Sequence, residues 1–80
     1  MYTLEQILGM YNKKIEYNLE LKREMNEGYI NEEEYQNLLI VLENLKDKEV
    51  NKAIEQLETL DNFARDVFSD VLMRNNRGVV

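Results

Sequence analysis

Cysteine, histidine, proline and tryptophan are all absent from the 80 residues of this chain. Without cysteine there is neither a disulfide nor a thiolate metal site. Without histidine the chain lacks the commonest general base and the commonest zinc ligand. We therefore expect no catalytic residues, no metal site and no cofactor, and a protein that is not an enzyme.

The scarcity of helix-breaking residues favours helix throughout the chain. Proline is absent and glycine occurs only at Gly9, Gly28 and Gly78. In a helix interior, proline costs about 3 kcal/mol and glycine about 1 kcal/mol relative to alanine. No window shows the alternation of β-branched and aromatic residues that is typical of strands. The sequence predicts the all-α fold class, with residues 1–80 forming a single domain.

Long apolar runs are also lacking. None approaches the roughly 20 residues that a membrane-spanning helix needs, and residues 1–5 lack the basic start and apolar core of a signal peptide. We expect a cytoplasmic protein with no membrane partner. The ten asparagines, beside many lysines, glutamates and isoleucines, are typical of AT-rich coding DNA, as in many low-GC bacteria and their phages. Small acidic helical chains of such composition are often encoded by phages or other mobile elements, which is one expected source.

Acidic residues are concentrated in the middle of the chain. Residues 27–70 contain twelve acids and four bases, a net charge of −8, whereas the whole chain has −6. Nucleic-acid binding requires clustered lysine or arginine, so we expect no direct nucleic-acid partner. The acidic middle favours basic partners.

The first helix is predicted over about residues 4–27. Thr3 is a good N-cap, and Gln6 three residues later completes a capping box. Gly28 ends the helix where a left-handed C-cap suits glycine. Tyr17 falls outside the apolar stripe and is a candidate interface residue. The apolar positions at helical spacing are Leu4, Ile7, Leu8, Tyr11 and Ile15.

The second helix is predicted over residues 31–46. Asn31 is its N-cap and Glu34 fits a second capping box. The short connection from Gly28 to Ile30 predicts that the first two helices form an antiparallel hairpin.

A third helix is predicted over residues 48–75, followed by a C-cap at Gly78. Its apolar residues alternate in spacings of three and four, which is the pattern of a coiled-coil seam. The seam consists of Val50, Ala53, Leu57, Leu60, Ala64, Val67 and Val71, and it is flanked by Ile54, Phe63, Phe68 and Leu72.

Two architectures are compatible with the stretch around Asp47. A turn there, with Asp47 as a cap, gives a three-helix bundle. A stutter there instead gives one continuous helix from Asn31 to about Asn75, roughly 66 Å long. The continuous helix would require a coiled-coil-like dimer to cover the seam. We expect a homo-oligomer in either case.

The stretch Glu27-Gly28-Tyr29-Ile30-Asn31-Glu32-Glu33-Glu34-Tyr35 resembles the short C-terminal domain (SHOCT) family. That family has a glycine, two apolar residues, a cap, acids and an aromatic residue, followed by lysines and a pair of leucines. The match covers residues 21–42, and Leu38 and Leu39 stand where the family has lysines. The resemblance implies an interaction or oligomerisation hairpin with no enzymatic activity.

Two sets of residues are the candidate functional surfaces. Phe63 and Phe68 are five positions apart and cannot both lie centrally on one helix face, so we expect one of them to flank the seam. Packing in the core or in a dimer is the first interpretation of these two residues, and an anchor for another protein is the second. The predicted partner or dimer interface is Val50, Ile54, Leu57, Leu60, Phe63, Ala64, Val67, Phe68, Val71 and Leu72. The predicted acidic recognition face is Glu55, Glu58, Asp61, Asp66 and Asp70, whose alternative interpretation is a solvated helix face.

These features lead to one functional hypothesis and two alternatives. The hypothesis is a small, non-enzymatic protein-binding module that modulates or inhibits a larger cytosolic protein. The first alternative is a structural protein that assembles with itself through the seam. The second is an acidic nucleic-acid mimic that sequesters a DNA-binding protein, because the carboxylates of residues 27–70 stand in for phosphates.

Overall fold

The computed structural model describes residues 2–77 of the chain, and the side chains of residues 2–75. This range contains five helices: α1 (Leu4–Gly9), α2 (Tyr17–Asn26), α3 (Glu32–Lys46), α4 (Val50–Glu58) and α5 (Asn62–Arg77). No strand occurs between residues 2 and 77, so the all-α prediction is confirmed there. The C-cap expected at Gly78 lies outside the described residues.

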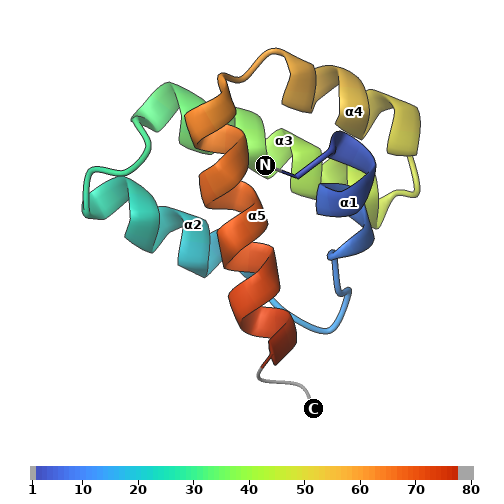
Figure 1. Ribbon diagram of the computed structural model, residues 1–80, viewed down its shortest axis with the longest axis horizontal. Helices are drawn as coiled ribbons and strands as arrows, with labels where there is room; N and C mark the ends of the chain where they lie inside the picture. The colour runs from blue at the N-terminus through green and yellow to red at the C-terminus, as the bar shows by residue number, and fades with distance from the viewer. Residues whose placement is uncertain (1, 78–80) are drawn as a thin grey trace.

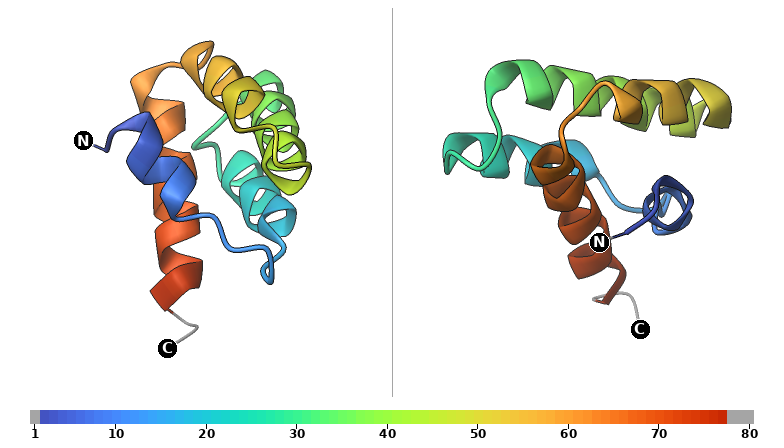
Figure 2. Two further views of the ribbon diagram at one scale, coloured as in Figure 1. Left: turned by 90° about the vertical axis from the view of Figure 1, so that its right-hand side faces the viewer. Right: turned by 45° about the horizontal axis from the view of Figure 1, so that its top comes forward.

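The helices pack around α3 and α5 (Figures 1 and 2). α3 lies between α2 and α4, while α5 packs across α2 and also contacts α1. The principal extents are 28 × 27 × 24 Å. A helix of roughly 66 Å does not fit within these dimensions, so the continuous-helix prediction is wrong.

The long first helix predicted over 4–27 is wrong, because residues 10–16 form a turn and a loop between α1 and α2. The Asn12 side chain accepts a hydrogen bond from the Lys14 N–H (2.9 Å), a local alternative to helical pairing. The Asn12 N–H donates to the hydroxyl of Tyr17 (3.1 Å). The break changes the helical phase, so Tyr17 is buried in the core and is not the interface residue that we expected.

The capping predictions for α1 and α3 are confirmed. Thr3 and Gln6 form a reciprocal capping box at α1, and Asn31 and Glu34 form another at α3. Gly28 has φ of 88° in the turn after α2. At this turn the N–H of Tyr29 donates to the carbonyl of Glu24 (3.0 Å), which ends the helix with a left-handed residue.

A second left-handed turn separates α3 from α4. Lys48 has φ of 61°, and the N–H of Glu49 donates to the carbonyl of Asn44 (2.7 Å). The chain therefore breaks beside Asp47, as one of the two architectures required. Asp47 is the C-cap of α3 and not the N-cap of the following helix.

The helix predicted over 48–75 is also interrupted, at residues 59–61. The hydroxyl of Thr59 donates to the carbonyl of Gln56 (2.7 Å) at the end of α4. The carboxylate of Asp61 accepts from the N–H of Ala64 (2.8 Å) at the start of α5. These two local bonds satisfy backbone groups at the break, so the heptad spacing continues across it without a continuous helix.

The break folds the predicted seam against the chain's own helices. Leu57, Ala64 and Val71 are fully buried, as are Leu21 of α2 and Leu38 of α3. One core thus includes residues from all five helices of the described chain. Neither the predicted three-helix bundle nor the long coiled coil matches this arrangement of five helices.

Candidate docking groove

A groove of about 690 Å³ lies between the end of α2, the turn that follows it and one face of α5. Tyr2, which precedes α1, completes its border. The lining residues are Tyr2, Glu24, Glu27, Tyr29, Phe63, Asp66, Val67, Asp70, Met73 and Arg74.

Helical spacing gives α5 two different faces. Phe63, Asp66, Asp70 and Arg74 are three or four positions apart and line the groove. The opposite set, which includes Phe68, is buried in the core. The core thus fixes the orientation of α5, and that orientation turns the other face towards the groove.

The groove displays three aromatic side chains to solvent. Phe63 is 58% exposed, Tyr29 is 52% exposed and Tyr2 is 37% exposed. The Tyr2 hydroxyl donates to the sulfur of Met73 at 3.5 Å. Aromatic residues are enriched at protein interfaces, because they supply a large contact area with few rotatable bonds.

The groove is strongly acidic. Glu24, Glu27, Asp66 and Asp70 contribute four carboxylates, and Arg74 is the one cation among the described lining residues. The four carboxylates outnumber this single cation, so the groove has an excess of negative charge. The rest of the lining is partly apolar. A groove of this kind favours a basic ligand over an acidic one.

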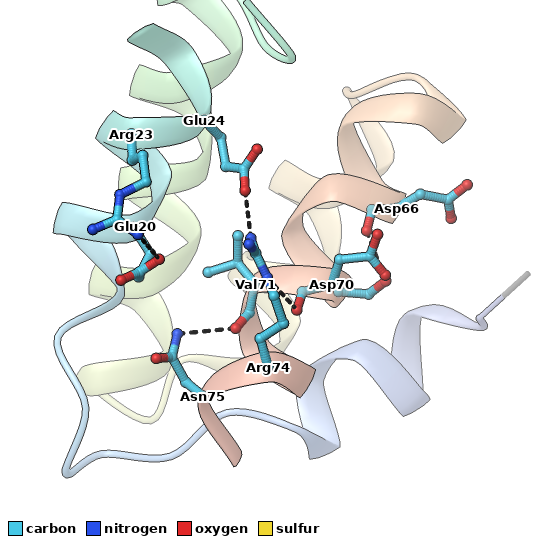
Figure 3. A network of polar contacts seen from close by, with 9 residues as sticks. Glu20, Arg23, Glu24, Asp66, Asp70, Val71, Arg74 and Asn75 are labelled. Carbon is cyan, nitrogen blue, oxygen red and sulfur yellow. Dashed lines mark hydrogen bonds and ion pairs between the residues drawn. The ribbon is translucent and has the colours of Figure 1, made fainter. Parts of the chain in front are cut away.

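Arg74 forms an ion pair inside the groove. Its Nη2 donates to Oε1 of Glu24, a residue on α2 that is only 7% exposed. Figure 3 shows the Arg74 side chain reaching from α5 towards this carboxylate, with Asp66 and Asp70 further along α5. A separate pair, Arg23 with Glu20 (3.7 Å), lies on the other side of Arg74.

The structure places only part of the predicted interface at the surface. Val50 and Phe63 are exposed and Ile54 is half-buried. The seam was expected to face a partner, but the turn at 59–61 lets these side chains pack within one chain. The residues that are buried in the core instead are Leu57, Leu60, Ala64, Val67, Phe68, Val71 and Leu72.

The predicted acidic face is divided between separate places. Asp66 and Asp70 line the groove, and Glu55 and Glu58 lie exposed on α4. Asp61 caps α5. The five carboxylates were predicted to share a face because the helix was assumed to run without a break.

Sequence reasoning missed the α2 side of the groove. Glu24, Glu27 and Tyr29 meet α5 only through the fold, since Glu24 and Arg74 are 50 positions apart. No local pattern reports such a pairing. Tyr29 alone carried a usable signal, because a large aromatic residue beside the exposed Gly28 turn has little local structure to cover it.

A second, smaller groove of about 340 Å³ lies between the α1–α2 loop and α3. Its charges are balanced, because Lys13 and Lys46 face Glu16 and Glu43. Tyr17 lines it, with the Tyr11 ring centroid 5.7 Å away. Burial raises the pKa of Tyr17 above its ordinary value of 10.0, against the opposing effect of the hydrogen bond from Asn12.

Neither a metal-binding cluster nor a membrane-spanning helix occurs in the described part of the chain. Among residues 2–75, no three acidic side chains lie close enough together to hold a metal ion. None of the helices within residues 2–77 combines the length and apolarity that crossing a bilayer requires.

Comparisons with protein-family models, with curated proteins and with solved structures find no match for this chain. The resemblance of residues 21–42 to the short C-terminal domain family stays a prediction. The groove itself is the basis for inferring a function.

Proposed function

We propose that this chain is a small, non-enzymatic protein-binding module that docks a basic segment of a larger protein in the acidic groove and thereby modulates that protein. One observation supports the proposal above others. Phe63 and Tyr29 are each more than half exposed within a groove that carries four carboxylates. Exposed aromatic rings beside charged side chains are typical of binding anchors.

The electrostatics of the groove support a partner that carries positive charge. Asp66 and Asp70 take part in no ion pair among the side chains of residues 2–75. Asp66 and Asp70 are four positions apart and lie on the same wall of the groove, so both carboxylates attract a basic partner. The same charges would steer such a partner during association.

Self-association through the predicted seam is the weaker alternative. The seam side chains Leu57, Ala64 and Phe68 already lie in the core of one chain. A second copy could reach only Val50, Ile54 and Phe63 of the predicted interface without opening the fold. No observed feature favours nucleic-acid mimicry over the binding of a basic protein segment.

The proposal is tested by affinity capture with two matched double variants. Asp66→Asn with Asp70→Asn removes two groove charges, while the backbone carbonyls of both residues keep their hydrogen bonds to Ser69 and Arg74. Glu55→Gln with Glu58→Gln removes two exposed charges on α4 and serves as the control.

Each form is immobilised and exposed to a bacterial lysate at low and at high salt, and the retained proteins are identified by mass spectrometry. We expect a protein with a basic surface that wild type and control retain and the groove variant loses. Equal retention by both variants would place binding outside the groove. Retention of no protein beyond the bait, together with a dimeric mass in solution, would favour self-assembly instead.

A further inference from the structure

We infer that the acidic groove receives an arginine side chain of the partner's basic segment at the position that Arg74 holds in the free protein. The inference rests on the proposed function and specifies the ligand chemistry of the same groove. It also assigns a role to Arg74, which competes with the partner for the carboxylate of Glu24.

The first observation is that the groove already binds one guanidinium. Arg74 donates to Glu24, whose side chain is almost entirely buried, whereas more than half of the Arg74 side chain is exposed. The carboxylate therefore has a fixed position, and the cation approaches it from the solvent side. An incoming guanidinium can reach Glu24 by the same route once Arg74 has moved aside.

The second observation is the set of groove carboxylates that Arg74 does not neutralise. Glu27, Asp66 and Asp70 form no ion pair among the side chains of residues 2–75. Among residues 2–75, no three acidic side chains lie close enough together to hold a metal ion. A single small cation therefore cannot pair with all three carboxylates, whereas a chain segment with several cationic side chains can.

The third observation distinguishes arginine from lysine. The rings of Tyr29 and Phe63 border the groove and are open to solvent. A guanidinium is planar and weakly hydrated, so it stacks on aromatic rings while its edge donates to a carboxylate. A lysine ammonium is strongly hydrated and lacks this geometry.

Competition predicts that removing Arg74 strengthens binding. Arg74→Gln leaves Glu24 available and makes the groove more negative. The matched control is Arg23→Gln, because Arg23 lies on α2, is largely exposed and pairs with Glu20 outside the groove. Both changes alter the net charge equally, so a difference between them reports on the groove and not on overall charge.

The probe is a fluorescein-labelled peptide with a repeated Arg-Ala-Ala sequence, and the matched peptide carries lysine in place of arginine. Fluorescence anisotropy gives the dissociation constant of each peptide with the wild type, Arg74→Gln, Arg23→Gln, Glu24→Gln and the Glu24→Gln/Arg74→Gln double variant. Circular dichroism verifies that each variant is folded before titration. Arg74→Lys replaces Arg74→Gln in the titrations if Arg74→Gln does not fold, because it keeps the positive charge and loses only the planar guanidinium.

We expect the arginine peptide to bind about three- to fivefold more tightly than the lysine peptide, the range for one partly exposed charged contact. We expect a gain of similar size from Arg74→Gln and a smaller gain from Arg23→Gln. Glu24→Gln should weaken binding more in the Arg74→Gln background than in the wild type, because Arg74 masks Glu24 in the wild type.

Two results would overturn the inference. Equal affinity for both peptides would remove the preference for arginine, and equal gains from Arg74→Gln and Arg23→Gln would remove the competition. In both cases groove-dependent capture of a basic protein from lysate would leave the proposed function intact. Loss of that capture, with the peptide preferences present, would refute the proposed function separately.

Discussion

Phe63 and Phe68 provide a direct test of the fold, because they are the same residue type on one helix in opposite environments. Phe68 is fully buried and Phe63 is 58% exposed. Truncating a buried phenylalanine to alanine costs about 3–5 kcal/mol, through lost transfer free energy and the cavity left behind. Truncating an exposed one changes stability by about 0.5 kcal/mol or less.

The loss at Phe68 is large for a chain of this size. A domain of 80 residues has a free energy of unfolding of about 4–12 kcal/mol. Phe68→Ala therefore removes a large part of the total, and the chain should unfold at much lower urea concentration. Phe63→Ala should leave the unfolding midpoint almost unchanged while weakening capture of the basic partner.

Urea denaturation followed by far-ultraviolet circular dichroism measures both variants at several protein concentrations. Equal destabilisation by Phe63→Ala and Phe68→Ala would refute the assignment of the two residues to opposite environments. An unfolding midpoint that rises with protein concentration would show that the folded state is an oligomer, as the predicted Val50–Val71 seam required.

Three further predictions follow from the turns and from Tyr17. Lys48→Gly should raise the free energy of unfolding by about 0.5–1 kcal/mol, because Lys48 has φ of 61°. Urea denaturation measures this free energy, and a lower value for the variant would contradict backbone strain at Lys48. Asp61→Ala should lower it by about 1 kcal/mol through loss of the cap on α5, whereas Asp61→Ser should restore most of it. The raised pKa of Tyr17 means that the folded chain keeps this proton longer than the unfolded chain, so its contribution is complete below pH 10.0 and is lost as the pH rises through the folded pKa. Tyr17→Phe should reduce the loss of stability between neutral and alkaline pH, and an unchanged pH dependence would contradict this assignment.

Local signals in the sequence were sufficient for the helix class and for several helix ends. The capping boxes at Thr3 and Asn31, and the left-handed Gly28, depend on residues within five positions of each other. Such signals need no tertiary information. The left-handed turn at Lys48 carried no comparable signal, because lysine has no preference for positive φ.

The breaks at residues 10–16 and 59–61 could not be predicted from apolar spacing. The first depends on the hydroxyl of Tyr17 reaching the N–H of Asn12, and the second on capping by Asp61 within an uninterrupted heptad pattern. The α5 half of the groove could be predicted only in part, because Asp66 and Asp70 are the two residues of the predicted acidic face that line it. The other half required knowledge that α2 packs against α5, which sequence spacing does not contain.

The ion pair between Glu24 and Arg74 also connects the C-terminal part of α5 to α2. The helix ends at Arg77, and its last described side-chain bonds run from Arg74 to the Asp70 carbonyl and from Asn75 to the Val71 carbonyl. In the proposed complex a partner arginine replaces Arg74 at Glu24, so this end of the helix loses its ion pair with α2. Amide hydrogens near Arg74 should then exchange faster in the complex, while those near Phe63 become more protected. Binding would thus stabilise one end of α5 and loosen the other.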